Sequence, residues 1–467
     1  MTGKTKILLL SDDIIGKNMA GPGIRVWEMA ISLSKEKDFE VGIACPDFSQ
    51  INNKDLPQLT FFKYSLHKEN KLINFASQFN VFILSGYILD KFPQLKNLNK
   101  FIIADLYIPF ILENLFVHDS NKSKLEDRQF IHNRDLGVLL NLLLNSHHFL
   151  CANKRQKDLY SGMLTAINKI NPYLMRFDRD LSKIFTVIPF GIREEKKEKD
   201  AKVLRGIFPD ISESDIILIW GGVLSNWFDP FILIEAMEEV IKVNPNFKLF
   251  FMSTKHPNPI VMKFPKAEEA KKLASQKNLL NKFIFFNKNW IPYNERHNYF
   301  LESDVGITTH LEHFETQFSF RTRILDYIHF NLPIICSKGD FFEQYIQKNS
   351  IGITVTPSNR DELKKAILSM GEKKFRDKFK KNIKKVEKEF YWDNLLLPLK
   401  EKLRNSQMLS ELKKIKSTEI YTGKETEIKN RYSTNPVSHF YQFYNIKRIL
   451  PSGFKIWLKR LIYKTKL

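Results

Sequence analysis

The sequence predicts an α/β protein with two doubly wound parallel sheets, one in each half of the chain. Short apolar runs bounded by turn residues alternate with longer stretches of helical periodicity, which is typical of β-α-β units. The chain has 467 residues, 43% of them hydrophobic, which exceeds the usual size of one domain. A mixed-charge run, Arg193–Asp200, separates two series of apolar runs. We expect this run to be an exposed linker that leads into a surface helix.

The predicted strands define the domains. The first series comprises Lys6–Leu10, Val41–Ala44, Val81–Leu84, Phe101–Ala104, Phe149–Cys151 and Phe185–Pro189. The second comprises Ile216–Trp220, Lys248–Met252, Phe283–Phe286, Val305–Thr308 and Ile334–Cys336. We therefore expect one domain over residues 1–192 and a second over residues 193–390.

The chain is strongly basic, with 73 Lys and Arg against 52 Asp and Glu, a net charge of +21. Such a charge favours a polyanionic partner, and nucleic acid, anionic lipid and nucleotide phosphates are all candidates. Zinc-finger spacing, an RNP-like aromatic motif and a basic region running into heptads are all absent, so we expect no nucleic acid. The scattered Cys45, Cys151 and Cys336 predict neither a zinc site nor a disulfide framework and fit a reducing compartment.

No apolar stretch is long enough to predict a membrane span. Ile7–Leu10 is too short for a signal segment, and Leu136–Leu144 is interrupted by Asn141. Crossing a bilayer takes about 20 apolar residues. We expect a cytoplasmic protein.

Glycines follow the first strand of each series. In open parallel sheets, ligands bind beyond the carboxyl ends of the strands. Gly21 and Gly23 would let backbone amides approach an anion at a helix N-terminus, although an ordinary glycine turn is the alternative because the GxGxxG pattern is incomplete. Arg25 is then a phosphate or acceptor contact, or a solvated helix residue. Gly221 and Gly222 are placed to meet a diphosphate.

Three later strand ends carry polar or aromatic candidates. Asp105 is a candidate general base or hydroxyl-binding carboxylate, with a helix N-cap as the alternative. Lys255 lies on a proline-rich loop and offers a counter-charge for phosphate oxygens. Trp290 and Ile291 offer an aromatic wall and a backbone edge for a base, or simple hydrophobic packing.

Residues 309–327 form the segment richest in candidate functional groups. Ser319–Thr322, including Phe320, predicts a helix N-terminus able to bind phosphate. Arg321 or Arg323 would add positive charge, and Asp326 lies about one turn inside that helix.

A possible metal site in the same segment is not supported. His310, Glu312 and His313 superficially resemble metal ligands. Their spacing does not match a helical HExxH pattern, so no metal is expected.

The ordered motifs resemble family 4 glycosyltransferases, in particular a branch that builds bacterial cell-surface polysaccharides. The resemblance covers roughly residues 1–400 and rests on GPGIRVWE, DLYIPF, FLCANKRQKDLY, VIPFGI, WGGVLSNWFDP, TKHPNP, NWIPYNER and ETQFSFRTRILDY followed by NLPII. Each motif is weak alone, but their order is specific for the fold. The resemblance implies the GT-B fold, in which two Rossmann-like domains face a central cleft. It also implies transfer of a sugar from a nucleotide-diphosphate donor with retention of configuration.

The resemblance assigns roles to individual residues. Asp326 matches the second acid of the EX7E signature, which implies that it holds the donor ribose hydroxyls. Phe318 stands where the first acid is expected, so either Glu315 reaches the donor sugar or that contact is absent. Asp105 occupies the place of a sugar-binding histidine.

A further departure concerns the diphosphate. The usual Arg/Lys pair is missing from residues 222–229, leaving Lys255 and Arg321 as replacements. Catalysis would then proceed by positioning and by stabilising the leaving diphosphate, without a metal or other cofactor. The predicted catalytic set is Asp105, Glu315 and Arg321. The predicted donor-binding set is Gly21, Gly23, Arg25, Gly221, Gly222, Lys255, Trp290, Ile291, Ser319, Phe320, Thr322 and Asp326.

The C-terminal residues carry two further predictions. The resemblance implies a crossover helix at 391–407, spanning Trp392–Arg404, that returns to the first domain and allows the cleft to open and close. Residues 408–467 contain 13 Lys and Arg against 4 Asp and Glu, a net +9, and we expect a basic helical tail. Its segment 452–464 is amphipathic and predicts an anchor on the anionic inner face of the cell membrane. Docking on the body of the protein or on a second subunit is the alternative.

Three functions remain open at this stage. The first is a hexosyltransferase-type enzyme that acts on a glycan or lipid-linked acceptor in cell-surface polysaccharide or glycolipid synthesis. The second is a nucleotide-sugar epimerase of the same fold, which would turn over donor without an acceptor. The third is a non-catalytic protein that binds a sugar or a partner.

Overall fold

The computed structural model describes residues 3–49, 51, 56, 58–117, 124–254 and 265–415. Residues 1–415 form one compact unit. Three sequence predictions lie outside the described residues: Lys255, the tail beyond residue 415 and its amphipathic segment 452–464.

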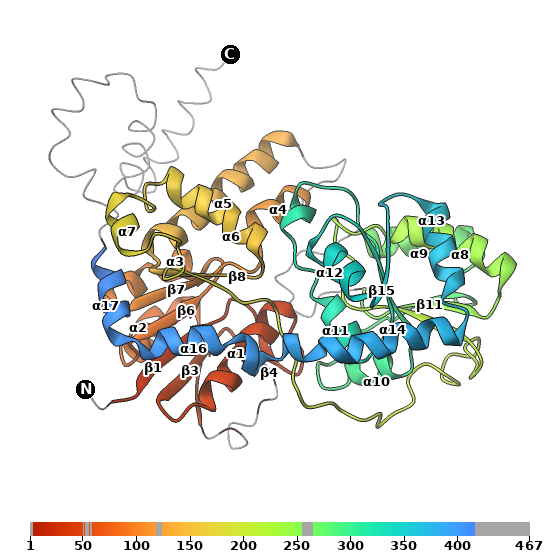
Figure 1. The fold of residues 1–467 in the computed structure, drawn as a ribbon, viewed down its shortest axis with the longest axis horizontal. Coiled ribbons are helices and arrows are strands. Elements are labelled where there is room, and N and C mark those ends of the chain that lie inside the picture. Colours follow the sequence, from red (N-terminus) through yellow and green to blue (C-terminus); the bar gives the residue numbers. More distant parts are fainter. Residues whose placement is uncertain are drawn as a thin grey trace, which may run out of the picture. The chain divides into compact units, whose positions relative to one another are not determined.

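The N-terminal half contains a seven-stranded, wholly parallel sheet in the order β5-β3-β1-β6-β7-β8-β9 (Figure 1). Its strands are β1 Thr5–Leu10, β3 Phe39–Cys45, β5 Leu59–Lys63, β6 Val81–Leu84, β7 Phe101–Asp105, β8 His148–Cys151 and β9 Phe185–Val187. The register pairs Thr5 with Phe39 and Ile7 with Val81. Central strands such as β6 are buried at every position, as expected where helices cover both faces of a parallel sheet.

The C-terminal half contains a second parallel sheet of six strands in the order β12-β11-β10-β13-β14-β15. These are β10 Ile216–Trp220, β11 Phe247–Phe251, β12 Ile284–Phe286, β13 Val305–Thr308, β14 Ile334–Ser337 and β15 Gly352–Val355. Strand order reverses between β10 and β13 here, and between β1 and β6 in the first sheet. Such reversal points open a crevice beyond the carboxyl ends of the strands, where ligands bind in doubly wound folds.

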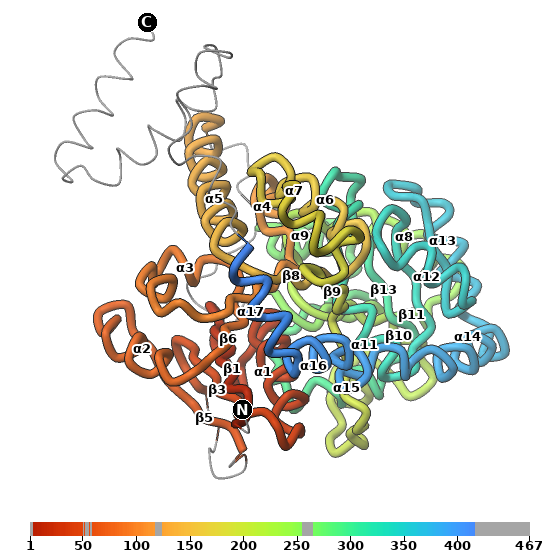
Figure 2. The backbone as a smooth tube through the Cα atoms, turned by 60° about the vertical axis from the view of Figure 1, so that its left-hand side comes forward, coloured from red at the N-terminus to blue at the C-terminus, as the bar shows by residue number. Residues whose placement is uncertain are grey.

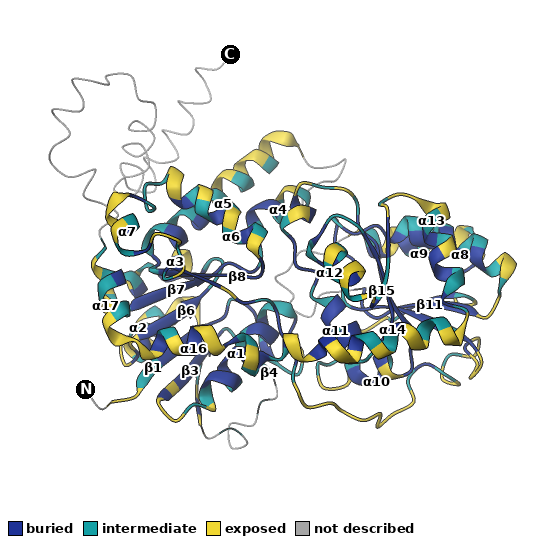
Figure 3. Ribbon diagram, in the orientation of Figure 1, coloured by how far each residue is buried: buried dark blue, intermediate teal, exposed yellow. Residues whose placement is uncertain are grey.

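Helices pack around both sheets, with their buried sides on the strands and their other sides exposed (Figure 3). The N-terminal half has α1 Gly21–Ser34, α2 Glu69–Ala76, α3 Ile88–Lys91, α4 Phe110–Val117, α5 Leu125–Asn145, α6 Lys154–Ala166 and α7 Pro172–Phe177. The C-terminal half has α8 Pro230–Val243, α9 Lys266–Gln276, α10 Arg296–Leu301, α11 Arg323–His329, α12 Phe341–Asn349, α13 Arg360–Ser369 and α14 Lys373–Val386. Side chains cap the N-termini of several helices. Asn153 accepts a hydrogen bond from the amide of Gln156 at α6, and Asp229, followed by Pro230, accepts one from the amide of Ile232 at α8.

The last described helices are α15 Trp392–Leu395, α16 Leu397–Arg404 and α17 Ser406–Lys414. Figure 2 shows α16 and α17 beside α1 and the first sheet, so the chain returns to the N-terminal half. Lys400 Nζ lies 2.8 Å from Glu36 Oε1, and Arg404 Nε lies 2.6 Å from Asp38 Oδ2. Residues 392–404, predicted as one crossover helix, form the two short helices α15 and α16.

All eleven predicted strands are present, so the predicted α/β fold with two doubly wound sheets is confirmed. The predicted surface helix after the linker is wrong, because no helix lies between β9 and β10. Residues 194–200 are exposed, as predicted for a linker. None of the helices in the described part of the chain is long and apolar enough to span a bilayer.

Candidate functional site

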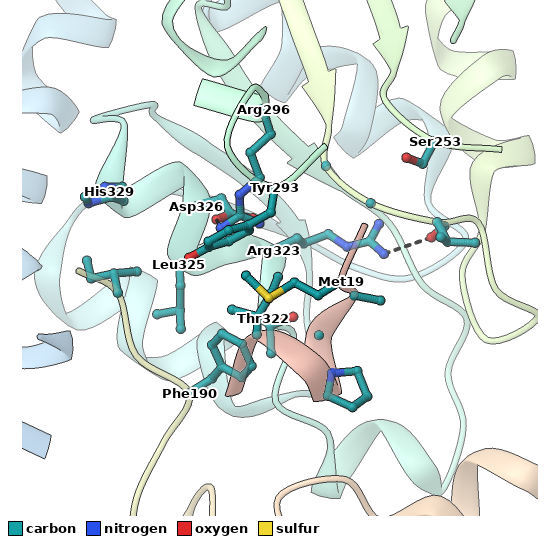
Figure 4. Close-up of a pocket in the computed structure, with 18 of the residues that line it drawn as sticks. Met19, Phe190, Ser253, Tyr293, Arg296, Thr322, Arg323, Leu325, Asp326 and His329 are labelled. Atoms are coloured by element: carbon teal, nitrogen blue, oxygen red, sulfur yellow. Dashed lines mark hydrogen bonds and ion pairs between the residues drawn. The ribbon is translucent and has the colours of Figure 1, made fainter. Parts of the chain in front are cut away.

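A cavity of about 830 Å³ opens at the carboxyl ends of the strands and is lined by residues of both halves (Figure 4). Ten of the predicted donor-binding and catalytic residues lie on its wall: Gly21, Gly221, Gly222, Trp290, Ile291, Ser319, Phe320, Arg321, Thr322 and Asp326. Gly23, Arg25, Asp105 and Glu315 do not line it. The structure thus brings most, but not all, of the predicted site together.

The two predicted glycine turns differ in what they offer a ligand. Gly222 has φ +82°, a backbone conformation that favours glycine. The neighbouring amide of Gly221 already donates to Tyr327 Oη at 3.0 Å. At the other turn, a side chain on Gly23 would lie 2.4 Å from the Ile14 carbonyl oxygen, so this glycine serves close packing of α1. Gly21 has open space around it.

Arg323 lies beside the Gly222 turn. Its guanidinium stacks 3.9 Å from the Phe228 ring centroid and 4.8 Å from that of Trp220, and Nη2 donates to the Val223 carbonyl oxygen at 3.0 Å. Nη1 is buried and has no hydrogen-bond partner among the described residues. Burial lowers the pKa of Arg323 to about 10. The sequence named this residue only as an alternative to Arg321, but it is the better placed cation.

Arg321 is engaged by a partner. Its Nη1 and Nη2 lie 3.1 and 2.8 Å from Glu315 Oε1 and Oε2, and both side chains are buried. The Glu315 carboxylate compensates the charge of this arginine in a two-point pair. Glu315 therefore holds Arg321 in place without itself reaching the cavity wall.

The region predicted as a phosphate-binding helix N-terminus is largely occupied by internal bonds. Helix α11 starts at Arg323, with Thr322 as its N-cap residue. The amides of Ile324 and Leu325 donate to the carbonyl oxygens of Arg321 and Thr322. Ser319 Oγ donates to the Thr316 carbonyl oxygen, and Phe320 packs against the rings of Phe341 and Phe342.

Asp326 forms a two-point ion pair with Arg296, with Nη2–Oδ1 2.9 Å and Nη1–Oδ2 3.3 Å. Arg296 in turn stacks 4.4 Å from the Tyr293 ring centroid. Burial raises the pKa of Asp326, and the charge of Arg296 opposes that shift. These three residues lie together in Figure 4, and Arg323 extends away from them towards the loop after β10. Arg296 and Tyr293 belong to the NWIPYNER motif but were not singled out from the sequence.

Arg25 and Asp105 are buried together and do not line the cavity. Nε lies 2.6 Å from Oδ2 and Nη2 lies 2.8 Å from Oδ1. Arg25 Nη2 and Nη1 also donate to the carbonyl oxygens of Ile188 and Pro189. This arrangement uses both charges inside the N-terminal half.

Glu113, on α4, lines the cavity and was not identified from the sequence. Burial and, to a smaller extent, the charge of Glu315 together raise its pKa to about 8, against the opposing charge of Arg321. No motif marked it in the sequence; the only indication was that it lies shortly after the predicted strand that ends at Ala104.

Both halves contribute directly to the surroundings of the cavity. Tyr293 Oη donates to Glu28 Oε1 at 2.8 Å, and the Tyr293 amide donates to the Lys17 carbonyl oxygen. Gln156 Nε2 donates to the Phe318 carbonyl oxygen at 2.8 Å. These contacts join the two halves of the chain beside the cavity.

The histidines considered as metal ligands have other roles. His310 Nε2 lies 3.0 Å from the Lys338 carbonyl oxygen, and burial lowers its pKa to about 3. His313 stacks on Phe116, and Glu312 is exposed. Across the described ranges, no three His, Cys, Asp or Glu side chains are grouped as they would be around a metal ion.

Residues 208–386 match the family model "Glycosyl transferases group 1". This segment, here called the group 1 domain, is similar to group 1 glycosyltransferases, which fits the resemblance to family 4 glycosyltransferases seen in the sequence. No curated protein matches the sequence.

Solved structures of similar fold cover most of this chain. Sucrose-phosphate synthase from Thermosynechococcus elongatus aligns with a TM-score of 0.59 at 15% identity, over 86% of this chain and 99% of that one. Anabaena HepE in complex with UDP and glucose gives 0.59 at 12%, over 86% and 100%. WaaG, a glycosyltransferase involved in lipopolysaccharide biosynthesis, gives 0.57 at 12%, over 85% and 98%. These likenesses confirm the GT-B fold.

The group 1 domain supplies one wall of the cavity. Gly222, Arg296, Arg323 and Asp326 all lie within the matched residues. Glu113 comes from the half of the chain before the match.

Proposed function

We propose that this protein is a retaining glycosyltransferase that moves a sugar from a nucleotide-diphosphate sugar to a glycan or lipid-linked glycan. One observation carries the proposal: the cavity beside the group 1 domain has a partly satisfied arginine, Arg323, at a glycine turn. Asp326 stands on the same wall. This arrangement offers a cation for a diphosphate and a carboxylate for ribose hydroxyls.

The donor binds with its nucleotide near Asp326. That carboxylate accepts hydrogen bonds from the ribose hydroxyls, and Trp290 and Tyr293 flank the base. The diphosphate lies at Gly222, where Arg323 Nη1 donates to a phosphate oxygen. Binding of UDP and glucose by HepE, and of UDP-2-fluoro glucose in a trehalose-6-phosphate structure from E. coli, supports this donor class.

Catalysis follows from charge placement. The bond between the anomeric carbon and the diphosphate oxygen breaks, a bond to an acceptor hydroxyl oxygen forms, and the proton of that hydroxyl passes to the leaving diphosphate. Negative charge grows on the leaving diphosphate, and Arg323, fixed by two rings and a carbonyl oxygen, stabilises it without reorganising. Arg321 stabilises the leaving diphosphate less, because Glu315 already compensates its charge.

We propose that the enzyme works at an anionic membrane surface. Its acceptor there would be a polysaccharide or a glycolipid. The basic tail beyond residue 415 supports this, and helix α14 supports it independently. Six lysines of α14 are exposed and form no ion pair among the described residues: Lys373, Lys374, Lys378, Lys381, Lys384 and Lys385. Basic segments gain about 1 kcal/mol per lysine at such surfaces.

A thermal-shift screen against nucleoside diphosphates and nucleotide sugars tests the donor site. A ligand that binds only the folded state raises the melting temperature. We expect a selective rise that is lost in Asp326→Ala and kept in the matched control Asp158→Ala, since Asp158 is exposed on α6. Absence of any rise with folded protein would contradict the proposal and favour a non-catalytic binding protein.

A further inference from the structure

We propose that Glu113 binds the sugar part of the donor through a hydrogen bond between its carboxyl group and a sugar hydroxyl. The inference rests on the proposed function, since it assigns one more contact within the same cavity. Glu113 lies on α4 of the N-terminal half and lines the cavity, close enough to Glu315 and Arg321 of the group 1 domain for their charges to act on it.

The charges around Glu113 favour an uncharged part of the donor. The charges of Glu315 and Arg321 act on the Glu113 carboxyl group in opposite directions. Arg321 is already held at two points by Glu315. With Arg321 compensated by Glu315 and Glu113 itself mostly neutral, this part of the wall offers no net positive charge to hold a diphosphate. The diphosphate instead has Arg323 and Gly222, and the ribose has Asp326.

A hydroxyl-bearing group fits the remaining space. A sugar hydroxyl both donates and accepts, and a neutral carboxyl group does the same. The titratable and charged groups that interact with Glu113 are Glu315 and Arg321 from the C-terminal half and Tyr107 and Tyr160 from its own half. Burial, reinforced by the Glu315 charge, raises the pKa of Glu113 to about 8. The carboxyl group is therefore mostly neutral at pH 7.

The protonation state gives the contact a defined pH dependence. Below pH 8 the neutral carboxyl group can donate to a hydroxyl as well as accept from one. As the pH rises through about 8, the proton and the donated hydrogen bond are lost. Affinity for the nucleotide sugar should fall as the pH rises through about 8. Affinity for the nucleoside diphosphate alone should not depend on the protonation of Glu113.

Calorimetric titration of three variants tests this role. Glu113→Ala removes the carboxyl group, and Glu113→Gln keeps a group that donates and accepts but does not titrate. The matched control is Glu126→Gln, because Glu126 is exposed on α5. The probes are UDP-glucose, or the nucleotide sugar with the largest thermal shift, and its nucleoside diphosphate without the sugar, at pH 6.5 and 9.

We expect Glu113→Ala to weaken nucleotide-sugar binding about tenfold, the loss of one hydrogen bond of about 1.4 kcal/mol, and to leave the nucleoside diphosphate unaffected. Glu113→Gln should match the wild type at pH 6.5 and bind more tightly than the wild type at pH 9. The control should behave as the wild type throughout.

Three results would overturn the inference. They are unchanged sugar affinity in Glu113→Ala, equal losses for both probes, and a loss in Glu113→Gln at pH 6.5 as large as in Glu113→Ala. A wild-type protein that binds no nucleotide sugar would contradict the proposed function itself, so the two failures are distinguishable.

Discussion

Arg25 and Asp105, 80 residues apart in the chain, meet in a two-point ion pair with N–O distances of 2.6 and 2.8 Å. Arg25 is 0% exposed and also donates to the Ile188 and Pro189 carbonyl oxygens. The pair therefore joins α1, the end of β7 and the segment after β9. Neither residue lines the cavity, which favours a structural role for the pair.

Removing one partner of this pair should destabilise the protein strongly. Arg25→Met leaves the Asp105 carboxylate buried without a counter-charge, which costs about 3–5 kcal/mol. Denaturant unfolding should show this loss, whereas Arg179→Met, at an exposed position, should stay within about 0.5 kcal/mol of the wild type. Unchanged stability together with lost donor affinity would show instead that Arg25 contacts the ligand.

Arg323 should be the main cation for the diphosphate. Arg323→Gln removes a charged hydrogen bond of about 1.5–3 kcal/mol and should weaken nucleoside-diphosphate binding about 10- to 150-fold by calorimetry. Arg360→Gln, at an exposed position on α13, is the control and should bind as the wild type. Equal affinity of wild type and Arg323→Gln would move the phosphate site elsewhere.

Asp340 should make stability depend on pH between about 4 and 6. Burial raises its pKa to about 6 from the ordinary 3.8, and its Oδ2 is buried with no hydrogen-bond partner in the described ranges. The folded state therefore binds a proton that the unfolded state has released, so this contribution is complete below pH 4 and is lost as the pH rises through 6.

Asp340→Asn keeps an acceptor for the Phe342 amide but does not titrate. Its stability relative to the wild type should rise by about 2 kcal/mol between pH 4 and pH 7, measured by denaturant unfolding at each pH. A constant difference across that range would contradict the raised pKa.

Helix α14 should contribute to binding of anionic lipid. We change Lys373, Lys374, Lys378 and Lys381 together to Gln. Each lysine near an anionic surface contributes up to about 1 kcal/mol of binding free energy. The affinity for phosphatidylserine-containing vesicles should therefore fall at least tenfold. Sedimentation with vesicles at low salt measures the effect, and neutral vesicles serve as the control. Unchanged binding would leave the tail beyond residue 415 as the candidate membrane contact.

The sequence predicts strands well where they are buried on both faces, because their apolar runs are continuous. Ile216–Trp220 is found with its predicted bounds as β10. Two edge strands, β5 Leu59–Lys63 and β15 Gly352–Val355, were not predicted, because only part of each is buried and its pattern is weak.

The location of the site could be predicted from the sequence, but the ion pairs within it could not. Three of the four predicted glycines, Gly21, Gly221 and Gly222, and most of the 319–326 segment line the cavity, as the topology of parallel sheets leads one to expect. Which charges neutralise one another depends on contacts between distant segments. The sequence could not show that Asp105 takes Arg25, or that Glu315 takes Arg321 and leaves Arg323 beside Gly222. Glu113 carried no motif at all.

The proposed activity can be measured as transfer of labelled sugar from nucleotide-sugar donors into the glycolipid fraction of bacterial membranes. We expect incorporation from at least one donor by the wild type and by Arg360→Gln, and at least tenfold less by Arg323→Gln. Donors that stay intact with cooperatively folding wild-type protein, or equal incorporation by Arg323→Gln, would contradict this proposal.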